Sequence, residues 1–158
     1  MPKALTIQPL IAFIDDDDGP MEFYEEALID EGFRLERIRD CVEAIHYIQE
    51  TTESPALWLI DLMMPVKDDS YKIPGERMAL SKASNRGLGV GRFLYQQIRK
   101  RFPSTPIIMF THLASAELLD TLEGEMDKNS SCEAKLDLDP TALVKLIQQR
   151  IKRTKRTK

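Results

Sequence analysis

The sequence is poor in cysteine and has no long hydrophobic run. Only two cysteines occur among the 158 residues, Cys41 and Cys132, and their separation fits no metal-binding motif. Without a secretory signal, they are expected to be reduced thiols of a cytosolic protein. The apolar segment near the start is short and runs directly into aspartates, which argues against a signal peptide and a membrane span. We therefore expect a cytoplasmic protein that does not contact the membrane.

An excess of positive charge is also missing. The formal net charge is −4, so direct binding to nucleic acid is not expected. Basic residues gather only near the end, where a solvated tail is expected over residues 153–158. The length and a hydrophobic fraction of 42% suit one compact domain, which we assign to residues 1–152.

A run of four aspartates directly after an apolar segment is the most informative feature present. Residues 11–14 are apolar, and Asp15 to Asp18 follow them. Carboxylates this close repel one another and favour a hard divalent cation between them. A second apolar run, residues 56–60, also ends on a carboxylate, Asp61. In neighbouring parallel strands, these acids meet where open α/β sheets place their ligands.

Apolar runs alternate with amphipathic stretches along almost the whole sequence. Strands are predicted near residues 11–14, 33–38, 56–60, 107–110 and 132–136. Helices are predicted near residues 20–31, 42–48, 88–102, 114–122 and 140–151. This alternation indicates an α/β fold, a doubly wound five-stranded parallel sheet with helices on both faces.

The residues at the ends of the predicted strands form an ordered set. In chain order they are Asp15 and Asp16, Asp61, Thr111 and Lys135. Such a set suits a site that accepts a phosphoryl group, because oxygens hold Mg²⁺, one carboxylate attacks phosphorus, and a hydroxyl and an amine bind the transferred oxygens.

At this point the sequence resembles the receiver domains of two-component response regulators. The matching residues cover essentially the whole chain: Ile14-Asp15-Asp16, Asp61-Leu62-Met63-Met64-Pro65, Thr111 and Lys135. The resemblance implies a flavodoxin-like (βα)5 receiver fold.

The same resemblance implies a role for each matching residue. Asp61 is the phosphoacceptor, and Mg²⁺ is held by Asp15, Asp16, Asp61 and the backbone carbonyl of Met63. Lys135 pairs with Asp61 in the resting state and with the phosphoryl group afterwards. The hydroxyl of Thr111 donates a hydrogen bond to that group.

The expected function is that of a switch and not of an enzyme, apart from self-phosphorylation and self-dephosphorylation. The phosphoryl group comes from a histidine kinase or a phosphotransfer protein. With no output domain after the last helix, we expect a stand-alone receiver that signals by protein–protein contact. A homodimer is left open.

Several positions depart from the family pattern. Leu136 replaces the usual proline, Cys132 replaces an aromatic residue, and His112 stands where a small residue is usual. The stretch 66–87 is interpreted as an inserted loop, and two alternatives stay open, a functional loop and a disordered one. The glycines at 87–91 are expected to let this loop turn back into a helix.

Asp17 and Asp18 are expected to cap and charge the N-terminus of the first helix.

Two alternative functions remain open. The departures at His112, Cys132 and Leu136 motivate a pseudo-receiver, a binding module that phosphorylation does not regulate. In addition, the segment 16–19 matches the Asp-x-Asp-Gly start of haloacid-dehalogenase-type phosphatases. That family places its nucleophile on this first motif, whereas here the strand ending in Asp61 precedes Thr111 and Lys135, so we disfavour the phosphatase.

Overall fold

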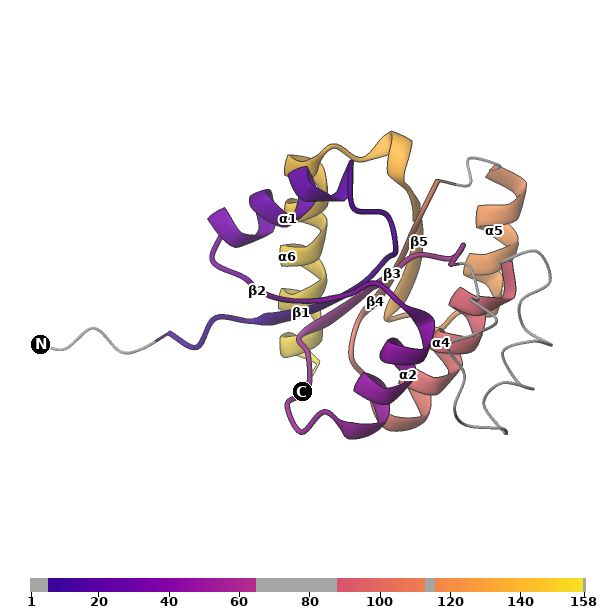
Figure 1. Cartoon of the computed structure of the whole chain (residues 1–158), viewed down its shortest axis with the longest axis horizontal. Coiled ribbons are helices and arrows are strands. Elements are labelled where there is room, and N and C mark those ends of the chain that lie inside the picture. Colours follow the sequence, from indigo (N-terminus) through magenta and orange to yellow (C-terminus); the bar gives the residue numbers. More distant parts are fainter. Residues whose placement is uncertain (1–5, 65–87, 113–115, 158) are drawn as a thin grey trace, which may run out of the picture.

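A single parallel sheet organises the chain in the computed structural model, which describes residues 6–64, 88–112 and 116–157. Within these ranges the strand order is β2-β1-β3-β4-β5, and every pairing is parallel (Figure 1). The strands are β1 (Leu10–Ile14), β2 (Arg34–Ile38), β3 (Leu57–Ile60), β4 (Ile107–Thr111) and β5 (Ser130–Ala134). The predicted five-stranded parallel sheet is confirmed, and the predicted insertion at 66–87 lies outside the described residues.

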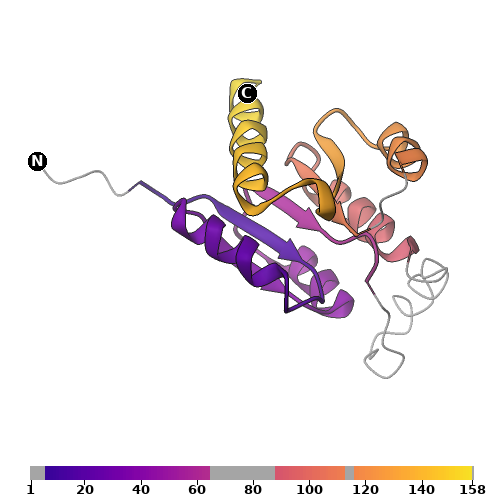
Figure 2. The ribbon, with the colours of Figure 1, turned by 90° about the horizontal axis from the view of Figure 1, so that it is seen from above.

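Helices cover both faces of this sheet. One face carries α1 (Met21–Asp30) and α6 (Pro140–Arg156), which pack against each other (Figure 2). The other face carries α2 (Cys41–Glu50), α4 (Leu88–Arg101) and α5 (Ala116–Glu125). A short 3-10 helix, η3 (Lys135–Asp137), connects β5 to α6. The doubly wound arrangement predicted from the alternating pattern is therefore present.

The core lies in two layers, one on each side of the sheet. All residues of β1, β3 and β4 are buried, because helices cover both faces of the central strands. Beneath α2 and α4, the ring of Trp58 contacts those of Tyr47 and Phe102. By contrast, β2 at the sheet edge alternates between exposed and partly buried positions and buries only Ile38.

Side-chain caps set the start of two helices. Asp40 Oδ1 accepts hydrogen bonds from the amides of Val42 and Glu43 at the start of α2. Asp139 Oδ1 accepts one from Ala142 at 2.7 Å, with Pro140 in the first turn of α6. The start predicted for the last helix is confirmed.

The first helix begins differently from the prediction. Its N-cap is Pro20, and no side chain caps the helix, so the prediction that Asp17 and Asp18 cap it is wrong. The Asp18 carboxylate instead pairs with Arg39, and the Asp17 backbone carbonyl accepts a hydrogen bond from Arg37 at 2.8 Å. These aspartates thus contact basic residues from β2 and its C-terminal end.

Three other boundaries move. The last strand ends at Ala134, so Lys135 follows it. The helix predicted at 114–122 extends to Glu125, and residues 114 and 115 of that prediction lie outside the described residues. Residues 153–156 of the predicted tail form the end of α6, because Lys and Arg favour helices and stabilise their C-termini. Among the described residues we find no helix whose length and hydrophobicity would let it span a bilayer.

Candidate functional site

The acidic residues meet at the carboxyl edge of the sheet because the hydrogen-bond ladder extends one residue past β1 and β3. The amide of Asp15 donates to the carbonyl of Ile38 at 3.0 Å, and the amide of Asp61 donates to that of Ile14 at 2.8 Å. Both aspartates thus belong to the backbone frame of the sheet, which holds them side by side.

Three carboxylates form a compact cluster at this edge. Asp15, Asp16 and Asp61 each offer one oxygen, and these oxygens all lie within 4.8 Å of one another. Asp15 is fully buried and Asp61 is 5% exposed. Carboxylate oxygens at this spacing match the preference of a hard divalent cation. The structure therefore brings together the three side chains predicted to bind metal, while the role of the Met63 carbonyl stays a prediction.

Lys135 provides the positive charge inside this cluster. Its Nζ lies 2.6 Å from Asp15 Oδ2 and 3.4 Å from Asp61 Oδ2, and the residue is buried. The predicted contact with Asp61 is present, but the shorter contact is with Asp15. One lysine faces three carboxylates, so the cluster retains net negative charge.

The electrostatic environment disfavours ionisation of Asp61. Burial raises the pKa of this carboxyl to about 6, although the Lys135 ammonium acts in the opposite direction. The Asp15 carboxylate adds to the increase, whereas the Met63 amide, 3.0 Å from Asp61 Oδ1, reduces it. Burial is also the main cause that raises the pKa of Asp16. A divalent cation would relieve both effects by favouring the charged carboxylates.

Thr111 and His112 lie at the carboxyl end of β4, the strand next to β3. Thr111 ends β4, which pairs with β3, and its side chain is buried. The half-exposed imidazole of His112 places Nε2 3.6 Å from Asp17 Oδ2. The histidine that stands where a small residue is usual thus contacts the acidic loop after β1.

Comparisons with solved structures identify the architecture. A response regulator receiver protein from Sinorhizobium medicae WSM419 matches with a TM-score of 0.68 and 16% identity, over 94% of this chain and 98% of that chain. A CheY-like receiver domain from Methanospirillum hungatei JF-1 gives 0.67 and 21%, over 96% and 99%. A Francisella response regulator receiver domain gives 0.62 and 24%, over 93% and 99%. The chain has the receiver fold.

The fold is recognised from structure and not from sequence similarity. No protein family model matches the sequence, and a search of curated proteins finds no match. The predicted flavodoxin-like receiver architecture is nevertheless confirmed, with the strand order and alternating helices described above.

Two of the residues that depart from the receiver pattern, Cys132 and Leu136, lie in different environments. Cys132 is buried in a cluster with Leu62, Met109 and Leu122, and burial raises the pKa of its thiol to about 12. It is therefore a packing residue beneath α5. Leu136 is 76% exposed on the 3-10 turn, where its side chain takes no part in the core.

Tyr24 contacts the turn that carries Lys135, and sequence reasoning missed this contact. Its hydroxyl donates to the carbonyl of Leu138 at 2.7 Å and approaches that of Lys135 at 3.3 Å, which ties α1 to the turn carrying the lysine. Its ring packs edge-on against Phe110, with centroids 5.1 Å apart. A hydrogen bond to a carbonyl far along the chain leaves no signal in the sequence.

Arg37 is a second residue that the sequence did not indicate. Its guanidinium forms an ion pair with Glu25 at 2.5 Å, donates to the Asp17 carbonyl, and lies 4.6 Å from the centre of the Phe13 ring. The arginine therefore connects β2 and α1 to the loop that carries Asp15 and Asp16.

Gly91 allows α4 to approach the loop after Asp61. A Cβ atom at this position would lie 2.6 Å from the Cα of Leu62, and the Gly91 amide donates to the Leu62 carbonyl at 3.3 Å. The glycine lies within the first turns of α4, so its role is close packing and not the loop reversal expected for it. Helix α4 is thereby packed directly on the chain that leaves the acidic cluster.

Proposed function

We propose that this chain is a Mg²⁺-dependent phosphoacceptor switch that takes a phosphoryl group onto Asp61 from a histidine kinase or a phosphotransfer protein. The observation that carries the proposal is the convergence of Asp15, Asp16 and Asp61 within 4.8 Å, with Lys135 Nζ between two of them. The receiver fold adds support, because the solved structures that share it include response regulator receiver domains.

The carboxylate cluster fits the proposed cation. Asp15, Asp16 and Asp61 would hold Mg²⁺, and the Met63 carbonyl would complete the protein ligands. When bound, the cation would supply positive charge that stabilises the charge developing during phosphoryl transfer. The raised pKa of Asp61 supports this assignment, because a buried carboxyl that resists ionisation gains most from a nearby cation.

Asp61 and the groups around it each have a role in the proposed phosphoryl transfer. A carboxylate oxygen of Asp61 forms the new bond to phosphorus, and the bond from phosphorus to the donor nitrogen breaks. Met63 holds Oδ1 through its amide, while Lys135 faces Oδ2. Lys135 can then bind the oxygens of the transferred group, and the Thr111 hydroxyl binds a further oxygen from the end of β4.

Signalling follows from the new dianion. A phosphoryl group on Asp61 adds charge at the junction of β3, β4 and β5, and the elements that contact it change their preferred positions. The proposed output is protein–protein contact in the cytoplasm, without enzymatic turnover of another substrate.

The test is phosphorylation by acetyl phosphate with Mg²⁺, followed by mapping of the modified residue. We expect one phosphoryl group on Asp61, its loss in Asp61→Asn, and its retention in the control Asp18→Asn, which changes an aspartate that pairs with Arg39. Label on Asp16 would indicate the phosphatase alternative. Failure to bind beryllofluoride with Mg²⁺ would indicate a pseudo-receiver, and either result contradicts the proposal.

A further inference from the structure

Strand β2 has an edge without a strand partner among the described residues. It pairs only with β1, and its ladder starts with the Arg34 amide on the Pro9 carbonyl and ends with the Asp15 amide on the Ile38 carbonyl, both at 3.0 Å. Backbone groups of successive strand residues point to opposite sides. Arg34, Glu36 and Ile38 therefore face β1, whereas the N–H and C=O groups of Leu35 and Arg37 face outward.

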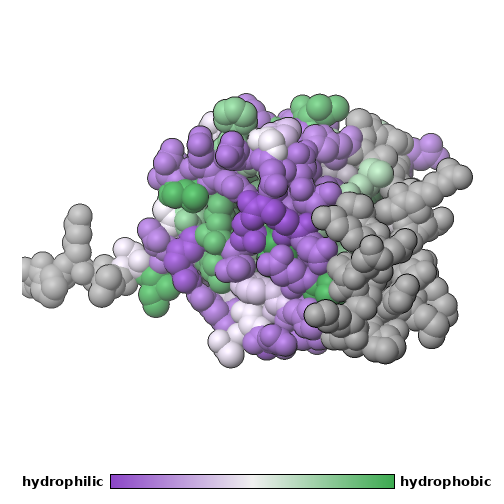
Figure 3. Space-filling model, viewed as in Figure 1, coloured by the Kyte–Doolittle hydropathy of each residue, from purple (hydrophilic) through white to green (hydrophobic). Residues whose placement is uncertain are grey.

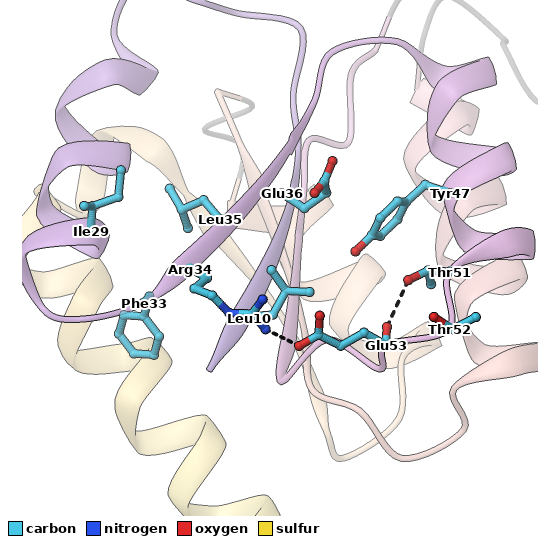
Figure 4. A pocket seen from close by; sticks show the side chains of 10 residues that line it. All are labelled: Leu10, Ile29, Phe33, Arg34, Leu35, Glu36, Tyr47, Thr51, Thr52 and Glu53. Atoms are coloured by element: carbon cyan, nitrogen blue, oxygen red, sulfur yellow. Dashed lines mark hydrogen bonds and ion pairs between the residues drawn. The ribbon is translucent and has the colours of Figure 1, made fainter. Parts of the chain in front are cut away.

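This edge is accessible. An open hollow of about 590 Å³ follows it, lined on one side of β2 by Ile29 and Leu35 and on the other by Glu36 and Tyr47 (Figure 4). Ile29 is 57% exposed, and Figure 3 shows hydrophobic side chains among hydrophilic ones in the area of α1 and β2. A second strand would thus meet backbone hydrogen-bonding groups flanked by apolar surface.

The exposed side chains of β2 carry opposite charges in a self-complementary order. Arg34 and Glu36 lie two residues apart, on the same face of the strand, and both are exposed. Arg34 pairs with Glu53, yet 44% of its side chain remains exposed, and Glu36 has no ion pair within the described part of the chain. A strand with a positive and a negative residue on either side of Leu35 can pair with an antiparallel copy of itself.

We propose that the β2 edge binds the β2 edge of a second copy of this chain, with the two strands antiparallel and the two Leu35 residues opposite each other. The outward N–H and C=O groups of Leu35 then exchange hydrogen bonds with those of the partner's Leu35. Arg34 faces the partner's Glu36 in a non-hydrogen-bonded pair, where opposite side chains are closest, and symmetry repeats the pair.

The charges of β2 favour this pairing register over the register centred one residue later. Pairing centred one residue later also satisfies outward backbone groups, but it places Glu36 directly opposite the partner's Glu36, which is unfavourable. The interface leaves the acidic cluster accessible, because that cluster lies at the carboxyl end of the strands and not along β2. Its existence is therefore independent of the proposed phosphorylation.

The test is sedimentation velocity of the full chain over a concentration series. We expect a reversible monomer–dimer equilibrium whose dissociation constant rises about tenfold or more in Glu36→Arg, because two attractive pairs become repulsive. Arg34→Glu should weaken association in the same way. An equimolar mixture of the two variants should associate again, since each Arg then faces a Glu, and the double variant Arg34→Glu/Glu36→Arg should recover the original dimer.

Two further variants complete the design. Asp120→Arg makes the same charge change as Glu36→Arg at an exposed position of α5 and should leave the dimer unchanged, because α5 packs on β5 at the other edge of the sheet. Leu35→Pro removes an outward amide, which an edge strand tolerates, and replaces a partly buried side chain at the margin of the core. It should abolish the dimer, while circular dichroism shows that the chain stays folded. Monomers at every concentration, dimers insensitive to Glu36→Arg, or no recovery in the mixture would overturn the proposal.

Discussion

The ammonium group of Lys135 lies closer to Asp15 than to Asp61, with Nζ–Oδ2 distances of 2.6 Å and 3.4 Å. The lysine is thus held mainly by the fully buried carboxylate of Asp15. Because this contact does not involve Asp61, we expect the lysine to keep its position when Asp61 changes its charge or bonding. A preorganised cation beside the proposed phosphoacceptor follows from this arrangement.

Asp61→Asn should stabilise the protein without divalent cations. The pKa of Asp61 is raised to about 6 in the folded chain. An unfolded aspartate has a pKa of about 3.9, so ionised Asp61 opposes folding above pH 6 by about 1–3 kcal/mol. This penalty disappears as the pH falls toward 4, where the folded-state carboxyl is protonated.

Thermal unfolding of the wild type and Asp61→Asn at neutral pH and near pH 4 checks this expectation. The variant should unfold at a higher temperature at neutral pH, and the difference should shrink in acid. A variant that is less stable than the wild type at neutral pH would contradict the assigned direction.

Mg²⁺ should stabilise the folded chain through the carboxylate cluster. A cation that binds only the folded state raises the free energy of unfolding. Once the cation concentration exceeds the dissociation constant, this increase grows with the logarithm of the concentration. We expect the unfolding temperature to rise with Mg²⁺ in the wild type and in Asp18→Asn. The rise should be much smaller in Asp16→Asn, and an equal rise in that variant would exclude Asp16 as a ligand.

Tyr24→Phe should weaken the support of Lys135. The substitution keeps the ring contact with Phe110 but leaves the Leu138 carbonyl without the hydroxyl donor now at 2.7 Å. We expect a loss of about 1 kcal/mol in unfolding free energy, measured by denaturant titration. Phosphorylation by acetyl phosphate should also slow, whereas the control Tyr47→Phe, on α2, should leave that rate unchanged. An unchanged rate in Tyr24→Phe would show that the hydroxyl does not position the lysine.

Gly91→Ala should disturb the packing of α4 on the loop after Asp61. The new Cβ would lie 2.6 Å from the backbone of Leu62, so the helix or the loop must shift, at a cost of about 1–3 kcal/mol. Gly124→Ala is the matched control in α5, because no atom lies within 4 Å of its Cβ position. Alanine there should stabilise the helix by up to about 1 kcal/mol. Equal effects of the two substitutions on unfolding free energy would disprove the close approach.

The acidic part of the site was accessible to sequence reasoning because each of its members ends an apolar strand. Asp15, Asp16 and Asp61 follow buried segments, and parallel strands bring such ends together. Capping by Asp17 and Asp18 was predicted wrongly, because local charge next to a helix does not specify the direction in which the chain turns. Their partners, Arg37 and Arg39, come from another strand and its end.

By itself, the sequence determined the alternation of strands and helices and the order of polar residues at the strand ends, because both depend on local periodicity. Only the tertiary structure decided that Lys135 approaches Asp15 most closely, that Tyr24 holds the turn after β5, and that Gly91 lets α4 touch Leu62. Each of these contacts joins segments separated by at least 29 residues (91 − 62). They depend on distances of a few ångströms between packed elements, which residue patterns along one chain do not encode locally.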